Sequence, residues 1–129
     1  MKPDRLKFFN EAGASILWCD YSRLPESEMI ELLIEAAKLG RQSGKRLLIL
    51  ADFAKTPKSK AFNERIKQEG KAYYKDGVDV QVAVLGIDSG LKRVIVNTTM
   101  IVTKIKNVKL FENREDAIKW LTKKSLASV

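Results

Sequence analysis

Residues 47–52 read LLILAD, five apolar residues closed by an acid, and this stretch decides the fold. A short, continuous apolar run is typical of a strand that is buried on both faces of a parallel sheet. Such a strand needs a layer of other elements over each of its two faces. We therefore expect the chain on either side of it to form helices.

Helical periodicity appears both before and after this strand. Apolar residues recur at helical spacing within residues 26–39, directly after Pro25, which suits a first helical turn. Downstream, Thr56 and Pro57 predict the cap and first turn of a second helix, whose apolar stripe runs through residues 62–73. The central strand therefore lies between two amphipathic helices.

The same alternation continues to the end of the sequence. Residues 80–87, which lead to Asp88, are predicted to form a strand, and residues 91–105 a third helix. The third helix is rich in β-branched residues, which favour strands, but its 3.6-residue period and its length decide for a helix. A short strand at residues 108–110 and a last helix, opened by Asn113 with Asp116, complete the pattern.

The amino-terminal part is predicted to be a hairpin. A first strand ends at Phe9, residues 10–13 form a four-residue turn, and residues 16–19 form the partner strand. The partner strand is continuously apolar, so both of its faces should be covered.

These elements predict the architecture. A hairpin followed by alternating helices and strands indicates an α/β fold: a mainly parallel sheet of about five strands, an antiparallel amino-terminal hairpin and four helices. The 129 residues fit a single domain, residues 1–129, which is long enough to bury a continuous core without disulfides.

Composition excludes several function classes. The chain has no histidine, which removes serine–histidine triads, cysteine–histidine dyads and histidine metal sites. Its one cysteine, Cys19, lies in an apolar run without a flanking base, which favours a core thiol over a nucleophile. No apolar run approaches the ~20 residues of a membrane helix, and the amino terminus lacks the pattern of a signal peptide. We expect a cytoplasmic protein with no membrane insertion, no metal and no cofactor.

The net charge of +8 is unevenly distributed. Residues 1–44 are nearly neutral, whereas residues 45–77 hold nine basic against four acidic groups and residues 78–129 nine against five. Such an excess favours anionic partners through long-range attraction. Because the lysines are scattered among acids and no nucleic-acid module is recognisable, a solvated basic surface is favoured over a nucleic-acid interface.

Candidate functional residues lie where strands end and helices begin. Asp20, Asp52 and Asp88 each close a strand, and ligands of parallel sheets meet this carboxyl edge. A magnesium-binding acidic pocket is one interpretation, but carboxylates at strand ends more commonly bond the local backbone.

Basic residues surround two of the helix starts. Positive charge there opposes the helix dipole by about 0.3–1 kcal/mol per exposed site, so a bound phosphate or nucleotide would explain it; solvated lysines are the alternative. The candidate anion- or partner-binding residues are Asp52, Lys55, Lys58, Ser59, Lys60, Asp88, Ser89, Gly90, Lys92 and Arg93.

Several short phrases together resemble a known family. They are the initial hairpin, the strand 48–52, residues 83–87 leading into 89–93, and the ending 108–111 with 117–121. In this order they look like the STAS-like domains, named for sulphate transporters and anti-sigma-factor antagonists. The resemblance implies a small non-enzymatic module that binds a protein partner.

One branch of that family is switched by serine phosphorylation. It carries Asp-Ser-Ser-Gly at the helix start where this chain has residues 57–61, PKSKA, so the motif is missing and Ser59 is the nearest hydroxyl. A lipid-binding branch, similar to CRAL-TRIO domains, shares the topology, but this chain is short for an enclosed lipid cavity.

The expected function is a non-catalytic regulatory or adaptor module. Its partner is a protein, with a second copy of the chain as one candidate, and the contact is expected at the carboxyl edge of the sheet. Two alternatives stay open: a small-molecule or lipid-binding domain, and a small enzyme working without histidine through Asp20, Asp52, Asp88, Cys19 and lysine or tyrosine side chains.

Overall fold

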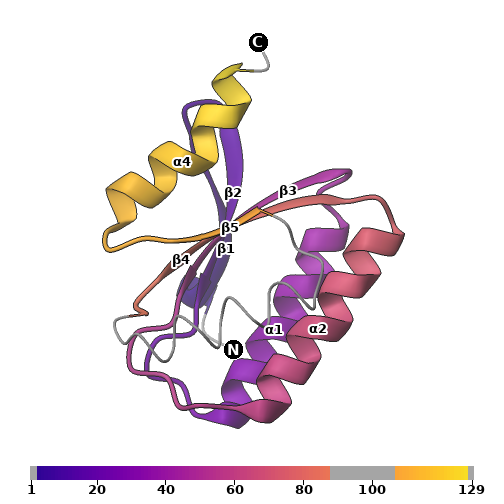
Figure 1. Ribbon diagram of the computed structural model, residues 1–129, viewed down its shortest axis with the longest axis vertical. Coiled ribbons are helices and arrows are strands. Elements are labelled where there is room, and N and C mark those ends of the chain that lie inside the picture. Colours follow the sequence, from indigo (N-terminus) through magenta and orange to yellow (C-terminus); the bar gives the residue numbers. More distant parts are fainter. Residues whose placement is uncertain (1–2, 88–106, 128–129) are drawn as a thin grey trace.

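A five-stranded mixed sheet forms the centre of the molecule, seen in a computed structural model that describes residues 3–87 and 107–127 (Figure 1). The strands are β1 (Leu6–Glu11), β2 (Ala14–Asp20), β3 (Arg46–Asp52), β4 (Asp79–Leu85) and β5 (Asn107–Leu110). The helices are the short 3₁₀ helix η1 (Pro3–Arg5), α1 (Glu26–Arg41), α2 (Lys60–Lys75) and α4 (Arg114–Ala127). The predicted α/β fold and antiparallel hairpin are confirmed; the predicted helix at 91–105 lies outside the described residues.

The strands follow one another across the sheet in sequence order, β1-β2-β3-β4-β5. Only β1 and β2 are antiparallel, and β2 to β5 run parallel. Because parallel crossovers are right-handed, strands added in one direction send their connecting helices to one face. Accordingly α1 and α2 pack side by side on one face, while α4, which comes after the last strand, packs on the other (Figure 1).

The hairpin turn is tighter than the sequence predicted. Glu11 pairs with Ala14, which leaves only Ala12 and Gly13 in the turn, and both have positive φ, +49° and +79°. Two residues with positive φ are the mark of a type I′ turn, whose twist matches that of the flanking strands. The expected four-residue loop at 10–13 is therefore wrong, because twist matching extends β1 to Glu11.

The face under α1 and α2 holds the larger core. Leu17 and Cys19 of β2, Leu32 of α1 and alternate residues of β3 and β4 are buried there. On the opposite face, Ala117 and Leu121 of α4 pack on Leu50 and its neighbours in β3 and β4. Cys19 is 1% exposed, so the prediction of a core thiol is confirmed.

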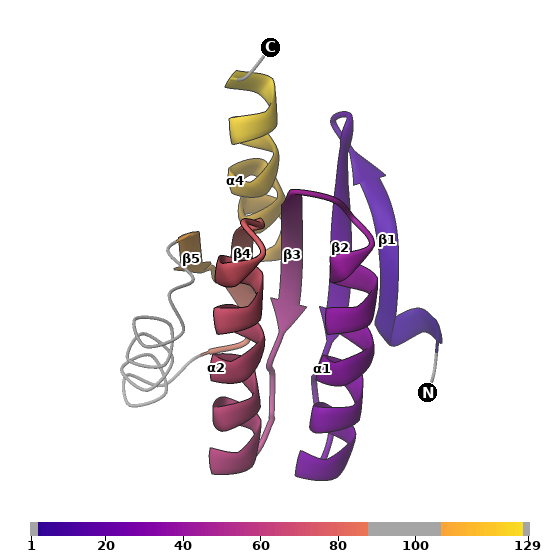
Figure 2. The ribbon, with the colours of Figure 1, turned by 90° about the vertical axis from the view of Figure 1, so that its right-hand side faces the viewer.

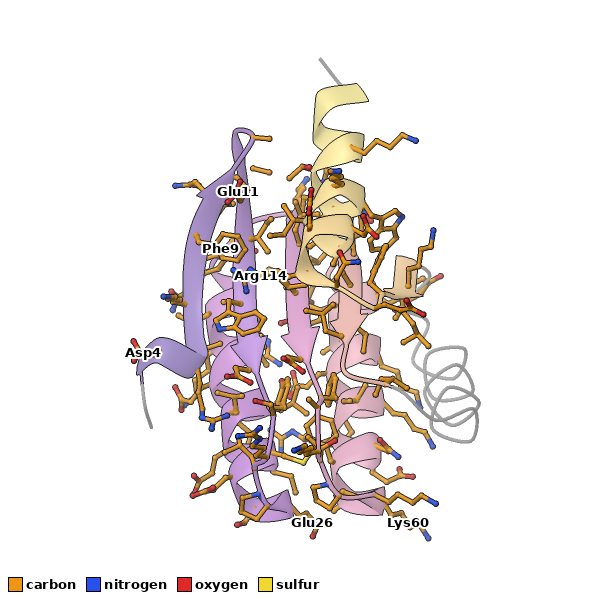
Figure 3. The ribbon with its side chains drawn as sticks, turned by 90° about the vertical axis from the view of Figure 1, so that its left-hand side faces the viewer. Asp4, Phe9, Glu11, Glu26, Lys60 and Arg114 are labelled. Atoms are coloured by element: carbon orange, nitrogen blue, oxygen red, sulfur yellow. The ribbon has the colours of Figure 1, made fainter. Side chains whose placement is uncertain are left out.

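At the start of α4, an arginine side chain extends the cover of that second face toward the hairpin. The Arg114 guanidinium lies 4.7 Å from the ring centroid of Trp18 and 5.1 Å from that of Phe9 (Figure 3). A guanidinium over aromatic rings at this distance is held by their electron-rich faces. The side chain thus links the start of α4 to the hairpin.

Two helix starts test the predicted caps. Asn113 caps α4, accepting the Asp116 backbone N–H at 2.9 Å, as predicted. The predicted cap at Thr56 is wrong, because Ser59 caps α2 by accepting the Phe62 N–H at 3.0 Å. The Thr56 hydroxyl instead donates to the Phe53 carbonyl, which closes the preceding turn.

Within the described residues, no helix has the length and apolar character needed to cross a membrane.

Candidate functional site

The carboxyl edge of β2, β3 and β4 lies at the end of the sheet where α1 and α2 begin (Figure 2). Asp20 and Asp52 close neighbouring strands there and pair in register. One oxygen of Asp20 accepts the backbone N–H of Ser22 at 3.0 Å and its hydroxyl at 2.5 Å. One oxygen of Asp52 accepts the Ala54 N–H at 2.9 Å. Both carboxylates therefore hold the local turns, the interpretation that the sequence favoured over a magnesium pocket.

The loops after β2 and β3 are joined to each other. Tyr21 N–H donates to the Asp52 carbonyl and Arg23 N–H to the Ala54 carbonyl, both at 2.9 Å. Beneath them, the ring of Tyr21 stacks on that of Phe53 at 4.8 Å, and Phe62 of α2 meets both rings edge-on. The paired loops and the start of α2 thus share one aromatic support.

Gly86, after β4, completes this support from the other side. Its φ is +84°, and a Cβ added there would collide with the Ala54 backbone nitrogen and lie 2.7 Å from the Asp52 carboxylate. Only glycine allows so close an approach with this backbone conformation. The end of β4 therefore packs directly on the Asp52 turn and holds it in place.

The starts of α1 and α2 are connected by one hydrogen bond. The Ser59 hydroxyl, in a residue only 6% exposed, donates to a Glu26 carboxylate oxygen at 2.6 Å. The same hydroxyl oxygen caps α2. Its proton is therefore already used, and a phosphate added to Ser59 would face the Glu26 carboxylate. Ser59 is consequently a poor hydroxyl donor to a ligand and a poor site for phosphorylation.

Glu26 also brings a negative charge to the start of α2. The sequence places only cations around this helix start, but the fold brings a carboxylate from α1 to it. Negative charge near a helix amino terminus is the arrangement that the dipole favours. The Glu26 carboxylate therefore already provides part of the negative charge that we expected an external anion to bring to the start of α2.

Four cations remain exposed at this edge, and we call Arg23, Lys55, Lys58 and Lys60 the basic edge. None of them forms an ion pair or a side-chain hydrogen bond with any residue in 3–87 or 107–127. Figure 3 shows Lys60 at the same end of the molecule as Glu26. The side chains of the basic edge are thus available to a partner.

Arg23 and Lys55 share an unusual backbone conformation. Their φ angles are +61° and +55°, in the left-handed region that side chains other than glycine, asparagine and aspartate rarely adopt. They lie on the paired loops, where Arg23 donates its backbone N–H to Ala54, the residue before Lys55. The fold therefore places two cationic residues on neighbouring, hydrogen-bonded loops, each in a conformation that costs about 1–3 kcal/mol.

An apolar cavity of about 80 Å³ lies between the sheet and the two helices α1 and α2. Cys19, Tyr21 and Tyr73 line it, together with aliphatic residues. Burial raises the pKa of the Cys19 thiol to about 12. A thiol that stays protonated at neutral pH does not act as a nucleophile.

The remaining predicted site residues lie outside the described part of the chain: Asp88, Ser89, Gly90, Lys92 and Arg93. Of the others, Asp52 holds a turn, Ser59 caps a helix, and Lys55, Lys58 and Lys60 lie on the exposed basic edge. Within residues 3–87 and 107–127, no three Cys, Asp or Glu side chains gather as a metal site would require.

The sequence did not predict two features of this edge: the position of Arg23, and the contact of Glu26 with Ser59. Arg23 carries no local pattern, because its importance comes from pairing with the loop after β3. The sequence indicates only that Glu26 favours its own helix dipole, and packing alone shows its contact with α2.

Comparisons with models of protein families, with characterised proteins and with solved structures found no match to this chain. The STAS-like resemblance therefore stays a prediction from the residues.

Proposed function

We propose that this chain is a non-catalytic regulatory or adaptor module that binds an acidic surface of a protein partner through the basic edge. The observation that carries the proposal is the pair Arg23 and Lys55. Both are exposed, form no ion pair with the described residues, and lie in left-handed conformations on loops joined by a backbone hydrogen bond. Strain of this kind persists where the surrounding structure enforces it, and it clusters at functional sites. Here the aromatic support below the loops enforces it.

The rigidity of the edge favours recognition. Loops held by paired backbone hydrogen bonds and stacked rings lose little conformational entropy on binding, which improves affinity for a given set of contacts. Long-range attraction between this edge and an acidic surface would accelerate association and would weaken as salt is added.

A catalytic role is disfavoured by the state of the candidate groups. The Asp20 and Asp52 oxygens named above accept hydrogen bonds from their own turns, and the Cys19 thiol is buried. With no histidine in the chain, the Cys19 thiol lacks the base that most often activates such a nucleophile.

The resemblance to STAS-like domains points the same way, toward a small module that binds a protein. The described sheet and helices are of the kind that resemblance implies. The buried, capping Ser59 departs from a serine that is switched by phosphorylation, so we propose constitutive binding without a switch at this position.

Affinity capture from extract of the source cell tests the proposal. The wild-type chain and two matched variants are used as baits: Arg23→Gln with Lys55→Gln, and Lys71→Gln with Lys75→Gln at the far end of α2. Both variants lose two exposed positive charges. We expect the wild type and the Lys71/Lys75 variant to retain one partner that the Arg23/Lys55 variant loses.

A purified partner then gives the quantitative result. The affinity should fall at least tenfold for Arg23→Gln with Lys55→Gln and should decrease with rising salt. Equal loss in both variants would mean that net charge alone acts, and no loss in either would remove the basic edge from the interaction. Both results contradict the proposal.

An anionic ligand at the same edge is an additional candidate. The amide resonances of residues 56–61 and 89–93 would move on titration with phosphate or nucleotides if the helix starts bind such an anion. Lys58→Glu with Lys92→Glu should then abolish the shifts. Shifts that stay still at millimolar ligand would leave the protein partner as the ligand of this edge.

The lipid-binding alternative is disfavoured by size. The cavity beneath α1 and α2 encloses about 80 Å³, whereas sites for drug-sized ligands measure roughly 300–1,000 Å³. A fluorescent fatty acid whose emission changes at micromolar concentrations of the chain would contradict this.

A further inference from the structure

The outer edge of β1 is unpaired. β1 is the terminal strand of the sheet, and of the described elements only the short η1 lies outside it, at the end where β1 begins (Figure 2). Because Glu11 and Ala14 flank a two-residue turn, they exchange backbone hydrogen bonds, and so do Phe9 with Ile16 and Lys7 with Trp18. The backbone N–H and C=O groups of Phe8 and Asn10 therefore point outward, where another strand can pair with them.

This edge lacks most of the features that usually prevent pairing, and the two charges it carries, on Lys7 and Glu11, are of opposite sign. Natural edge strands are kept apart by proline, bulges, very short length or dense charge. β1 has six residues, no proline and an unbroken register with β2. Phe8 on this strand is 39% exposed, one of two large apolar side chains so exposed among the described residues. The edge is thus open to a second strand.

The charges of β1 favour β1 of a second copy of this chain as the pairing strand. When two β1 strands pair antiparallel about a two-fold axis at Phe9, Lys7 lies opposite Glu11 of the second copy, and Glu11 opposite its Lys7. Lys7, Phe9 and Glu11 alternate along the strand and share one face, so each pair is a direct cross-strand neighbour. Both side chains are exposed and without ion pairs to the described residues.

The same register satisfies the outward backbone groups. Phe8 then lies opposite Asn10 of the second copy, so that the two outward-pointing residues exchange hydrogen bonds. The two Phe9 rings meet at the axis in a non-hydrogen-bonded pair, where side chains approach most closely. Arg114, stacked on Phe9, already holds this ring in place.

Other registers fit less well. A two-fold axis at Phe8 places Lys7 opposite Phe9 and Glu11 opposite Arg5, whose guanidinium already donates to the Asp20 and Ser22 carbonyls. An axis at Asn10 places Glu11 opposite Phe9 and Phe8 opposite the turn residue Ala12. Only the register at Phe9 forms two new opposite-charge pairs from uncommitted side chains.

We propose that two copies of this chain associate through β1, antiparallel and with the two-fold axis at Phe9, so that their sheets become one continuous sheet. A two-fold contact of this kind is self-complementary and closed. Pairing along one six-residue strand buries less surface than a standard interface, so the dimer dissociates on dilution. The basic edge is left open in both copies.

Sedimentation equilibrium of the full chain over a wide concentration range tests the proposal with a charge-swap series. Lys7→Glu and Glu11→Lys each place like charges opposite one another twice, and each should weaken the dimer about tenfold or more. The double variant Lys7→Glu with Glu11→Lys restores opposite charges and should return the dimer toward wild-type strength. Glu31→Lys, an exposed change on α1, is the control and should leave association unchanged.

The rescue distinguishes this register from other contacts. A chain that stays monomeric at millimolar concentration overturns the proposal, and so does a dimer that Lys7→Glu does not weaken. Failure of the double variant to regain association, with its circular dichroism and denaturant midpoint like wild type, would equally remove the Phe9 register.

Discussion

The two faces of the sheet are covered in different ways. Among the described elements, two helices, α1 and α2, cover one face across β2, β3 and β4, whereas α4 covers part of the other and reaches the hairpin through its first residue, Arg114. The difference arises from strand order: sequential strands with right-handed crossovers place their connecting helices together. Of the described helices, only the one that comes after the last strand packs on the opposite face, so the cover of that face depends on α4 and on the Arg114 stack.

The largest expected effect compares the two cores. Leu32→Ala under α1 and Leu121→Ala under α4 each remove a fully buried side chain, which costs about 2–5 kcal/mol. We expect Leu32→Ala to lower the free energy of unfolding of the whole chain, measured by urea denaturation. Leu121→Ala should first increase amide hydrogen exchange in α4 while α1 and α2 stay protected. Equal loss of protection on both faces would contradict independent covers.

Alkaline pH should act on the α1 and α2 face. Burial raises the pKa of Cys19 and of Tyr73 to about 12 and raises that of Tyr21, and all three line the cavity there. The unfolded thiol ionises above its ordinary pKa of 9.0, but the folded thiol does not until about pH 12. The unfolded state therefore binds fewer protons in this window, and stability falls as pH rises.

The matched variant for that effect is Cys19→Ala. Its free energy of unfolding, measured against wild type from pH 7 to 12, should be lower at neutral pH but should decline less steeply above pH 9. Parallel pH profiles for the two chains would show that the thiol contributes nothing to the alkaline loss.

On the α4 face, the Arg114 stack gives a smaller effect. Arg114→Ala removes a guanidinium from two rings and should cost about 1 kcal/mol in urea denaturation. In a Trp120→Phe background, Trp18 fluorescence should shift to the red as its ring becomes exposed. Lys123→Ala, an exposed change on α4 at a residue without ion pairs to the described residues, is the control and should change neither quantity. An unchanged Trp18 spectrum would mean that Arg114 does not cover the ring.

The smallest effect concerns buried polar groups on the two faces. Gln81, under α4, has a buried side-chain oxygen without a hydrogen bond, whereas the Tyr73 hydroxyl under α1 donates to the Ala37 carbonyl. Gln81→Met removes the unpaired oxygen but also loses the bond from the Gln81 amide nitrogen to the Trp120 carbonyl, so stability should stay within about 0.5 kcal/mol of wild type. Tyr73→Phe should cost about 0.5–1 kcal/mol. A clear loss in Gln81→Met, measured by thermal and urea denaturation, would mean that this oxygen is satisfied in solution.

Much of the fold was predictable because its signals are local. The apolar run at 47–51 predicts a doubly buried strand, and β3 is buried on both faces. The Asn113 and Asp116 cap spans one helical turn and is predicted from spacing alone. Two local predictions were wrong. Ser59 rather than Thr56 caps α2, and a type I′ turn leaves two residues instead of four in the hairpin loop.

The candidate site was only partly predictable. Lys55, Lys58 and Lys60 were identified from charge at a helix start, and the structure leaves them exposed. Arg23 was missed because its place depends on a hydrogen bond to Ala54, 31 positions along the chain. The role of Glu26 was missed for the same reason, since its partner Ser59 lies 33 residues away.

The sequence by itself determined which of the described segments become strands and helices, because burial periodicity and caps act over a few residues. Tertiary structure alone decided which charges meet: it brought Glu26 to the start of α2, paired the loops of Arg23 and Lys55, and placed Arg114 on Phe9 and Trp18. Those contacts depend on strand order and crossover hand, and the local pattern of residues does not encode the distances between the ends of different elements.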